Sequence, residues 1–540
     1  MVAETRIRIA HRALAEPRAL ERAAALALGV GESEISGLTV LRRSLDARHG
    51  EPSWEIRLRA WVGESPTTEL LAGFCARDVR AAEPVLVVGS GPAGLFAALG
   101  LVEAGLRPIV VERGRDVRGR RLDVARLCRE GVVDPDCNYG FGEGGAGTFS
   151  DGKLYTRSTK RGDVRGVLET LVQHGAPVDV LVDAHPHVGT NRLPAVVSAL
   201  RRSIEECGGE VRFGTRVTDL LRDGDTVVGV VVRPSADGAA TATAGASAVE
   251  NLRARAVVLA TGHSARDVYE ILDRSAVRLE RKPFALGVRV EHPQALVDAM
   301  QYHAAVRAPG LPAASYSIVE RSGGRGLFSF CMCPGGIMCP AATAPGEVVV
   351  NGWSPSSRNS RWANSGIVVE VRDEDLLPFA DRGALAGVAF QGAVEHAAFA
   401  AGGGGLVAPA QRLLDFCEGR PSRDLPAASY RPGLAAADLS SVLPEPIGAA
   451  LRDGLRRIGR RMRGFATNDA VVVAVESRTS APVRIPRDPA TLEHPDLRGL
   501  FPCGEGAGFA GGIVSAALDG LRCAAAVASR LGATVGKTPN

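Results

Sequence analysis

Apolar and polar residues alternate in two short segments near the start of the chain, residues 5–13 and 53–62. Alternation with a period of two is typical of a strand that buries one face. Between these segments, residues 20–30 form an alanine- and leucine-rich run that ends at Gly29 and Val30, which predicts a helix with a glycine stop. We therefore expect residues 1–80 to form a small α+β domain.

A different pattern begins near residue 84, where a continuous apolar run is interrupted by glycines spaced Gly-x-Gly-x-x-Gly over residues 89–94. The run predicts a buried strand over Val85–Val88, a turn, an apolar helix from about Pro92 and a second strand that ends at Glu112. Glycines at this spacing let a pyrophosphate approach the helix N-terminus, and the Glu112 carboxylate can accept a hydrogen bond from a ribose hydroxyl. This stretch predicts a dinucleotide site.

The same glycine spacing occurs twice more, at residues 142–147 and 506–511, without the complete pattern around it. The first has neither a strand before it nor a helix after it. The second has a strand and a helix but no following strand that carries an acidic residue. Glycine lets backbone amides come close to a ligand, so both segments are expected to reach one cofactor at the carboxyl ends of the strands.

The rest of the chain predicts an α/β fold in which the nucleotide domain is interrupted. Residues 211–234 and 252–267 predict a β-meander that returns to a parallel core strand, and the low-complexity residues 235–251 between them predict a surface loop. Residues 276–490 predict an inserted α+β substrate domain, with strands at 284–293, 315–320 and 347–354 and a helical segment at 378–400. We expect domains at residues 1–80, 81–275 with 491–540, and 276–490.

Composition narrows the class of protein. The 540 residues are 45% hydrophobic and 23% charged with a net charge of +4, as in an ordinary globular chain. The basic residues are nearly all scattered arginines, so we expect no nucleic-acid partner. The N-terminus lacks the apolar core of a signal peptide and the longest apolar run is the glycine-containing one, so we expect no membrane span. Ten irregularly spaced cysteines indicate reduced thiols in a cytoplasm.

Four motifs, GSGPAG (89–94), GFGEGGAGTFSDGKL (140–154), ATGHSARD (260–267) and FPCGEGAGFAGGI (501–513), together resemble a bacterial family of largely uncharacterised FAD-dependent dehydrogenases. The FAD domain of this family is similar to that of glutathione-reductase-type flavoproteins. The resemblance implies FAD as the cofactor and a Rossmann FAD domain with an inserted substrate domain. It implies FAD contacts by Gly89, Ser90, Gly91, Pro92, Ala93, Gly94, Glu112, Arg113, Gly144, Gly145, Gly147, Thr148, Ser150, Asp151, Gly152, Lys153, Val217, Thr261, Gly262, Gly504, Glu505, Gly511, Gly512 and Ile513.

Candidate catalytic residues follow from side-chain chemistry. Glu476 and Arg478 come directly after a strongly apolar strand, and Arg478 could pair with a substrate carboxylate or form a solvated salt bridge at the strand end. His187, in a Pro-His-x-Gly turn, could act as an acid–base catalyst or simply bond the backbone. A helix that starts near Ile513 would favour the reduced flavin anion through its dipole.

The stretch FSFCMCPGGIMCP (328–340) places three cysteines within nine residues. Zinc needs four ligands and no second pair or nearby histidine accompanies them, so we expect no metal. On a regular strand Cys331 and Cys333 share one face with Met332 opposite, and a disulfide between them would be strained. We interpret the stretch as a strand and turn on the substrate side of the flavin in which the thiols pack; catalysis by Cys333 is the alternative.

The sequence predicts an FAD-dependent oxidoreductase that transfers a hydride between the flavin and a small organic substrate, with an external electron donor or acceptor. A flavin monooxygenase on the same fold and a non-catalytic FAD-binding module that senses redox state are the alternatives. No second complete dinucleotide fingerprint is present, and no Cys-x-x-Cys follows the first glycine motif, which argues against a disulfide reductase with its own nicotinamide domain.

Overall fold

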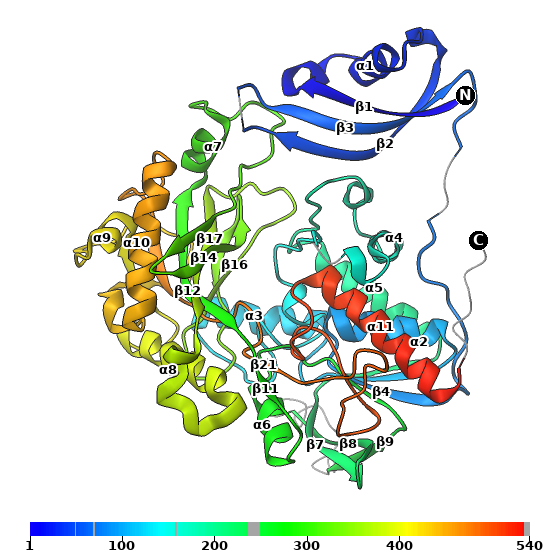
Figure 1. Ribbon diagram of the computed structural model, residues 1–540, viewed down its shortest axis with the longest axis vertical. Coiled ribbons are helices and arrows are strands. Elements are labelled where there is room, and N and C mark those ends of the chain that lie inside the picture. The colour runs from blue at the N-terminus through cyan, green and yellow to red at the C-terminus, as the bar shows by residue number, and fades with distance from the viewer. Residues whose placement is uncertain (49, 68–70, 157–158, 236–248, 534–540) are drawn as a thin grey trace.

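The computed structural model describes residues 1–48, 50–67, 71–156, 159–235 and 249–533. Its first part is a three-stranded antiparallel sheet in the order β1-β3-β2, with helix α1 packed on one face (Figure 1). Strand β3 and helix α1 lie where the sequence pattern predicts them. Strand β1 begins earlier than the predicted segment 5–13 and ends at Ala10, because residues His11–Ala15 form a 3-10 helix, and β2 is an additional strand. The bounds are β1 (Val2–Ala10), α1 (Ala19–Leu28), β2 (Ile35–Asp46) and β3 (Ser53–Val62).

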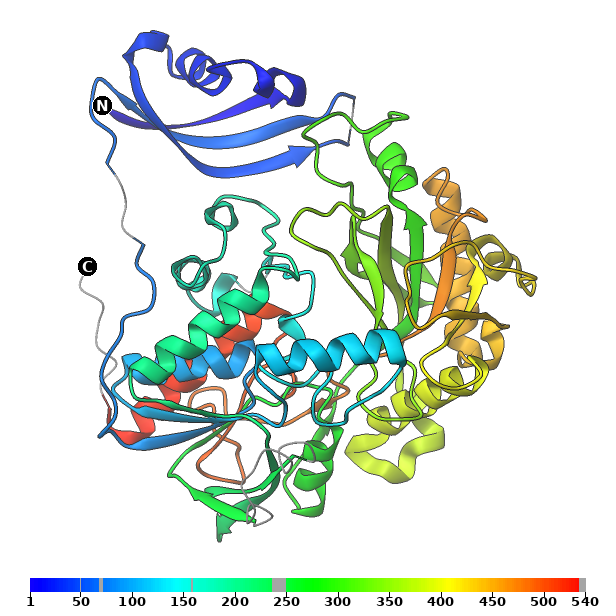
Figure 2. The same ribbon diagram turned by 180° about the vertical axis from the view of Figure 1, so that it is seen from behind.

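A five-stranded parallel sheet in the order β22-β10-β4-β5-β6 brings the last strand of the chain beside the earlier ones. Helices α2 and α11 pack against each other on one face of this sheet, and a three-stranded antiparallel meander, β7-β8-β9, covers the other face (Figure 2). The strand bounds are β4 (Pro84–Val88), β5 (Arg107–Val111), β6 (Glu210–Arg212), β7 (Thr215–Asp223), β8 (Thr226–Pro234), β9 (Glu250–Arg253), β10 (Val257–Leu259) and β22 (Leu500–Pro502). The helices are α2 (Pro92–Glu103), α3 (Val117–Glu130), α4 (Val164–Gln173), α5 (Leu193–Glu206), α6 (Arg266–Arg274) and α11 (Ile513–Leu531).

Strand β4 illustrates why the sequence here is continuously apolar. Val85 and Val87 pack into the core shared with the helices, while Leu86 and Val88 pack into the core shared with the meander. A parallel strand buried on both faces has no position for a polar side chain. The predicted strand, helix and second strand of this βαβ unit are therefore confirmed, and helix α11 begins at the predicted residue, Ile513.

A seven-stranded sheet in the order β13-β14-β17-β12-β20-β18-β19 forms the third part, with helices α8, α9 and α10 packed against it. The strands are β12 (Phe284–Pro293), β13 (Val319–Ser322), β14 (Arg325–Cys333), β17 (Trp362–Val371), β18 (Ala408–Arg412), β19 (Leu434–Ala436) and β20 (Val471–Glu476). A separate hairpin contains β15 (Ile337–Pro340) and β16 (Val350–Trp353). The helices are α7 (Gln294–Tyr302), α8 (Ala386–Ala401), α9 (Leu413–Glu418) and α10 (Glu445–Arg461).

Two predicted strands of the seven-stranded part and its hairpin are wrong in their bounds. The strand expected over residues 315–320 begins only at Val319, because the preceding backbone makes a different bond. The N–H of Ile318 donates to the side-chain hydroxyl of Ser329 at 2.8 Å instead of joining the strand ladder. The strand predicted at 347–354 is also shorter, since β16 begins at Val350.

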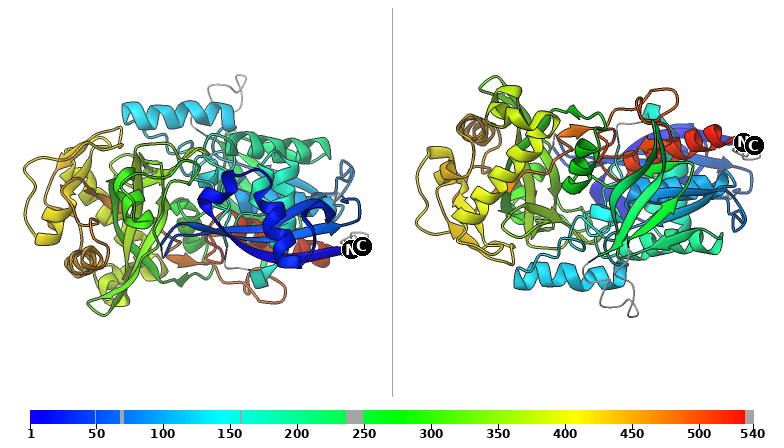
Figure 3. Two further views of the ribbon diagram at one scale, coloured as in Figure 1. Left: turned by 90° about the horizontal axis from the view of Figure 1, so that it is seen from above. Right: turned by 90° about the horizontal axis from the view of Figure 1, so that it is seen from below.

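The three parts meet at defined contacts. A short antiparallel ribbon of β11 (Glu280–Arg281) and β21 (Val483–Arg484) marks where the chain enters and leaves the seven-stranded part. The N-terminal sheet lies over the rest of the molecule in the view from above (Figure 3, left). The Arg43 side chain forms an ion pair with Asp179 at 3.2 Å and a hydrogen-bonded ion pair with Asp183, and His11 bonds the carbonyl oxygen of Pro309 at 2.9 Å. The first part therefore contacts both others.

Residues 236–248 of the low-complexity loop predicted at 235–251 lie outside the described residues, and Glu250 and Asn251 belong to strand β9 rather than to a loop. Within the described part of the chain, the structure contains no helix that is both long and apolar enough to cross a membrane.

The packing of α11 against α2 gives a test of the fold. A Cβ atom on Gly520 would lie 2.1 Å from the carbonyl oxygen of Ala93 in α2, so Gly520→Ala must push the two helices apart. We expect a loss of about 1–3 kcal/mol in the free energy of unfolding. The matched control is Gly392→Ala in α8, where the nearest atom is 3.8 Å away; there we expect a gain of roughly 0.4–1 kcal/mol. Denaturant unfolding followed by circular dichroism measures both, and equal effects would contradict the close helix contact.

Candidate functional site

A cavity of about 450 Å³ lies where the parallel sheet meets the seven-stranded sheet. Residues that follow the carboxyl ends of β4, β5, β10 and β22 line it, which is the edge at which open parallel sheets bind their ligands. Residues of β14 and β16 close it from the other side. The lining residues are Val88, Gly89, Gly91, Pro92, Ala93, Val111, Glu112, Arg113, Tyr139, Gly140, Phe141, Gly145, Ala146, Gly147, Ser150, Asp151, Gly152, Lys153, Tyr155, Thr215, Val217, Ala260, Thr261, Gly262, His263, Ser264, Ala265, Val268, Phe330, Cys331, Asn351, Arg478, Thr479, Glu505, Gly511, Gly512, Ile513 and Ala516.

In the glycine turn after β4, the fold requires glycine at two positions but not at a third. Gly89 has a φ of +99°, and a Cβ there would lie 2.5 Å from the carbonyl oxygen of Ala260. A Cβ on Gly94 would lie 1.9 Å from the carbonyl oxygen of Gly89. At Gly91 the φ is −69° and the nearest protein atom would be 3.9 Å from an added Cβ. The protein itself leaves room at Gly91, so the missing side chain makes space for a ligand.

Two helix N-termini lie at this cavity. Helix α2 begins at Pro92 directly after the glycine turn, and α11 begins at Ile513 after Gly511 and Gly512. A Cβ on Gly511 or Gly512 would meet no protein atom within 4 Å. Free backbone N–H groups and the positive end of the helix dipole attract anionic groups. The arrangement suits a ligand that carries negative charge at two separated places.

Glu112 has more protein partners than the sequence suggests. One carboxylate oxygen accepts hydrogen bonds from the backbone N–H and the hydroxyl of Ser90, both at 2.9 Å. The other accepts from the N–H groups of Gly114 and Gly142, both at 3.0 Å. Glu112 therefore fastens two glycine-containing loops to the end of β5, in addition to lining the cavity.

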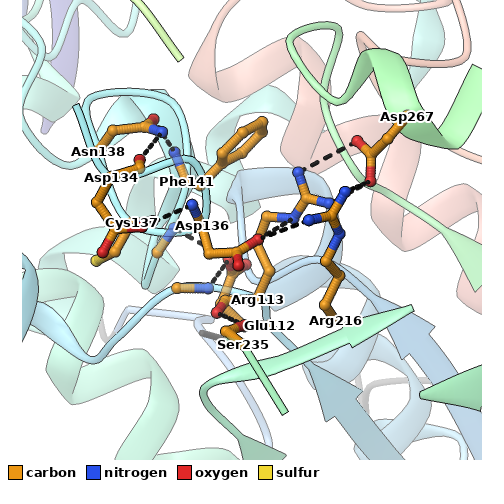
Figure 4. A network of polar contacts seen from close by, with 12 residues as sticks. Glu112, Arg113, Asp134, Asp136, Cys137, Asn138, Phe141, Arg216, Ser235 and Asp267 are labelled. Carbon is orange, nitrogen blue, oxygen red and sulfur yellow. Dashed lines mark hydrogen bonds and ion pairs between the residues drawn. The ribbon is translucent and has the colours of Figure 1, made fainter. Parts of the chain in front are cut away.

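An arginine–aspartate network surrounds the lining residue Arg113 beside the meander (Figure 4). Arg113 donates to Asp267 at 3.2 Å and stacks over the ring of Phe141 at 4.6 Å. Arg216 from β7 donates to Asp136 at 3.4 Å and to Asp267 at 3.0 Å. The network ties β5, β7, α6 and the loop before Phe141 together. The sequence motifs point to Arg113 but not to its partners, which come from distant segments.

The opposite end of the cavity carries a lysine and two thiols. The Lys153 ammonium lies 3.2 Å from Asp151 and 3.8 Å from the sulfur atoms of both Cys331 and Cys333. Asp151 also pairs with Arg358 at 3.1 Å. The two thiols lie on the same side of β14, as expected, although β14 is not a regular strand at this point. Strand β14 has a bulge between Phe330 and Cys333, and Cys331 takes a φ of +48°.

Glu476 lies behind this end of the cavity and does not line it. Burial raises the pKa of Glu476 to about 7, even though Arg289 donates to its carboxylate at 2.7 Å. Arg289 also donates to the side-chain oxygens of Asn364 at 2.6 Å and Asn351 at 3.2 Å. The pair thus supports Asn351, a cavity residue for which the sequence carried no signal.

Arg478 lines the cavity, but its guanidinium already has partners. It donates to Glu347 at 2.7 Å, to Glu395 at 2.9 Å and to the hydroxyl of Thr343 at 2.5 Å. Arg266 of α6 pairs with the same two carboxylates, at 3.0 and 2.8 Å. This geometry favours a structural ion pair over a free cation for a substrate carboxylate. The pair is buried, unlike the solvated bridge that the sequence suggested.

His187 is not among the lining residues. Its Nε2 lies 3.3 Å from the carbonyl oxygen of Ser356, and its backbone pairs with that of Lys153. Burial, reinforced by the charge of Arg358, lowers the pKa of His187. These contacts favour the backbone-bonding role, and an acid–base role for His187 stays a prediction.

Five of the proposed FAD contact residues also lie outside the cavity lining: Ser90, Gly94, Gly144, Thr148 and Gly504.

The Glu395 cluster gives a stability test with a defined pH dependence. Burial alone would raise the pKa of Glu395, but Arg266 and Arg478 lower it to about 2 from an ordinary value of 4.5. Because the folded-state pKa is depressed, this stabilisation is fully present above about pH 4.5 and is lost as the pH falls toward 2. At pH 7, Glu395→Gln should cost about 3–5 kcal/mol of the free energy of unfolding, since it leaves the buried cations Arg266 and Arg478 to share the carboxylate of Glu347.

The matched control is Glu270→Gln, an exposed position on the same helix as Arg266. It should change the free energy of unfolding by less than about 0.5 kcal/mol. The difference between wild type and Glu395→Gln should shrink between pH 5 and pH 3. A difference that stays constant over this range would show that the ionised carboxylate does not stabilise the cluster.

Three segments of the chain match models of known protein families. Residues 82–258 match the family described as "FAD binding domain", and residues 283–479 match "FAD-dependent protein, C-terminal domain-like". Residues 1–61 match a domain of unknown function. An uncharacterized protein of Clostridium beijerinckii is 39% identical over 528 residues, which are 94% of this chain and 95% of that protein.

More distant similarities are also found. A thiamine thiazole synthase of Aeropyrum pernix is 28% identical over 226 residues, which are 41% of this chain and 71% of that enzyme. Among solved structures, a geranylgeranyl bacteriochlorophyll reductase-like protein of Thermoplasma acidophilum is 13% identical with a TM-score of 0.34, covering 84% of this chain and 79% of that one. The flavin-dependent brominase Bmp2 is 13% identical with a TM-score of 0.35, covering 83% and 79%.

The matched FAD-binding residues contain the glycine turn and Glu112, and the matched C-terminal residues supply the opposite wall of the cavity. FAD is the cofactor of this protein, which is an FAD-dependent oxidoreductase with a mixed α/β fold. With near full-length identity of 39% to the Clostridium protein, the chain belongs to a bacterial family of FAD-dependent proteins.

Proposed function

We propose that this protein transfers a hydride between FAD and a small organic substrate held at the Lys153 end of the cavity. The observation that carries the proposal is the cavity itself, which has FAD-type glycine turns on one side and polar side chains of the seven-stranded part on the other. A bound flavin supplies a centre that accepts or gives a hydride. A site with polar groups at this position favours an enzyme over a non-catalytic FAD module.

The FAD contacts follow from the shape of the glycine turns. The open space at Gly91 and the N-terminus of α2 suit the pyrophosphate, and Glu112 and Val217 suit the adenosine half. The open glycines before Ile513 suit the flavin, where the positive end of α11 would favour a reduced, anionic ring. The full contact set is the one that the family resemblance implies. We further propose a glutathione-reductase-type arrangement, supported by helices on one sheet face and a meander on the other.

The substrate end carries groups that can orient a polar molecule. Lys153 offers a cation, and the amide oxygen of Asn351 is occupied by Arg289 and the N–H of Gly352, which leaves its amide N–H groups as donors. Phe330 and Tyr155 supply apolar surface. A small substrate with an anionic or carbonyl oxygen fits this combination. The proposal includes an external electron donor or acceptor that restores the flavin after each reaction. It also includes a division of the chain into domains at residues 80, 275 and 490.

The Gly91 position tests the cofactor site. Gly91→Ala should fold normally, because its Cβ would have 3.9 Å to the nearest protein atom, yet it should purify with little FAD because the methyl group occupies the pyrophosphate position. Gly94→Ala should lose both flavin and stability, since its Cβ clashes with backbone 1.9 Å away. Flavin absorbance per protein and the unfolding midpoint measure the two effects. Normal FAD content in Gly91→Ala would refute the assignment of this turn.

The type of reaction is tested by anaerobic stopped-flow reduction. NADH and NADPH should reduce the flavin slowly, because one dinucleotide site is filled by FAD; rapid saturable reduction would reveal a nicotinamide site. A small organic substrate should bleach the flavin without oxygen and leave a product two electrons more oxidised. If turnover instead requires oxygen and the product gains an oxygen atom from it, the protein is a monooxygenase and the hydride-transfer proposal fails.

A further inference from the structure

The thiols of Cys331 and Cys333 have surroundings that differ from those of packing groups. Cys331 is partly exposed and lines the cavity, whereas Cys333 is buried directly behind it. Both sulfur atoms lie 3.8 Å from the same ammonium group, that of Lys153. A thiol that only packs would face apolar side chains. A cation equidistant from two sulfurs is instead the setting in which a cysteine loses its proton.

The backbone is shaped to bring the two sulfurs together. From the pair Phe330–Gly366 to the pair Cys333–Asn364, β14 advances three residues while β17 advances two, so β14 contains one extra residue. Cys331 takes up this residue with a φ of +48°, a conformation that a side chain with a Cβ rarely adopts. The Cys333 thiol lies 3.3 Å from the carbonyl oxygen of Cys331 and within reach of the Cys331 sulfur, so its one proton can go to either acceptor. A regular strand would not permit these contacts.

The surrounding charges favour one particular protonation pattern. The hydrogen bond from Cys333, followed by the charges of Lys153 and Arg289, holds the pKa of Cys331 well below its usual range. The same hydrogen bond, together with burial, holds the pKa of Cys333 above its usual range. One thiolate beside one thiol is the pairing from which a disulfide forms.

We propose that Cys331 and Cys333 are a redox-active dithiol that exchanges two electrons with the bound flavin. In the oxidative direction the Cys331 thiolate and the Cys333 thiol form an S–S bond and give up two electrons and one proton, which oxidised FAD accepts. In the opposite direction reduced flavin returns them and the bond breaks. The inference rests on the proposed position of the flavin in this cavity, and it makes the cavity suitable for a substrate that reacts through a thiol or a disulfide.

Anaerobic titration of the holoprotein tests this proposal by counting electrons. After oxidation with diamide and removal of the reagent, the wild type should take up about four electrons per flavin, two for FAD and two for the disulfide. Cys331→Ser and Cys333→Ser should each take up about two. Cys339→Ser, a buried thiol of the neighbouring strand β15, is the matched control and should still take up about four. An uptake of about two electrons by the wild type would overturn the proposal.

Peptide mapping of the oxidised wild type gives a second readout that needs no variant. Mass spectrometry without reductant should find the bond between Cys331 and Cys333. The chain offers an internal comparison, because Cys503 and Cys523 are also buried and hydrogen-bonded to each other but do not line the cavity. A disulfide at Cys503–Cys523 with free thiols at Cys331 and Cys333 would overturn the proposal.

Alkylation by iodoacetamide tests the role of Lys153. Removing its charge in Lys153→Met should move the pH profile for modification of Cys331 to higher pH, because the thiolate then forms at higher pH. The profile of the exposed Cys75 should not change. An unchanged profile at Cys331 would show that Lys153 does not hold a thiolate. Because these three readouts do not depend on turnover, failure to find a small organic substrate would count against the proposed function alone.

Discussion

The fold of the FAD-binding part depends on close approach of backbone to backbone at positions without a Cβ atom. An added Cβ would lie 1.9 Å from a carbonyl oxygen at Gly94, 2.1 Å at Gly520 and 2.4 Å at Gly506. These contacts fix the turn after β4, the packing of α11 on α2 and the approach of the C-terminal turn to Gly262. Because protein interiors are closely packed, none of these segments can move away without disturbing the others. The cavity is the space that they leave.

Charged side chains hold the two walls of this cavity together in a different way. Arg266 belongs to the FAD-binding part. It pairs with Glu347 and Glu395 of the seven-stranded part, which also pair with Arg478. Buried ion pairs add little net stability compared with apolar packing, but they tolerate almost no change in geometry. Glycine contacts therefore shape the cofactor side, and ion pairs fix the position of the opposite wall.

Much of the FAD-binding part was predictable because its pattern is local. The strand at Val85–Val88, the helix from Pro92 and the acidic Glu112 lie within one continuous stretch, and their contacts depend on spacing alone. The opposite wall was less predictable because its contacts join distant segments. Arg478 pairs with Glu395, 83 residues away, and Arg289 pairs with Glu476, 187 residues away. The bulge at Cys331 depends on pairing with β17, which no local pattern encodes.

The buried cluster around Arg478 also limits motion between the two walls of the cavity. A hinge motion between the two walls would separate Arg266 from both of its carboxylates and expose charges that are now paired. The side chain of Tyr155, by contrast, lines the cavity and is 51% exposed, with the ring of His185 at 4.9 Å. Access past an exposed side chain needs only rotamer changes, which take picoseconds to nanoseconds, whereas opening of domains takes microseconds to milliseconds. Exchange of small molecules past Tyr155 would then need no separation of the two walls.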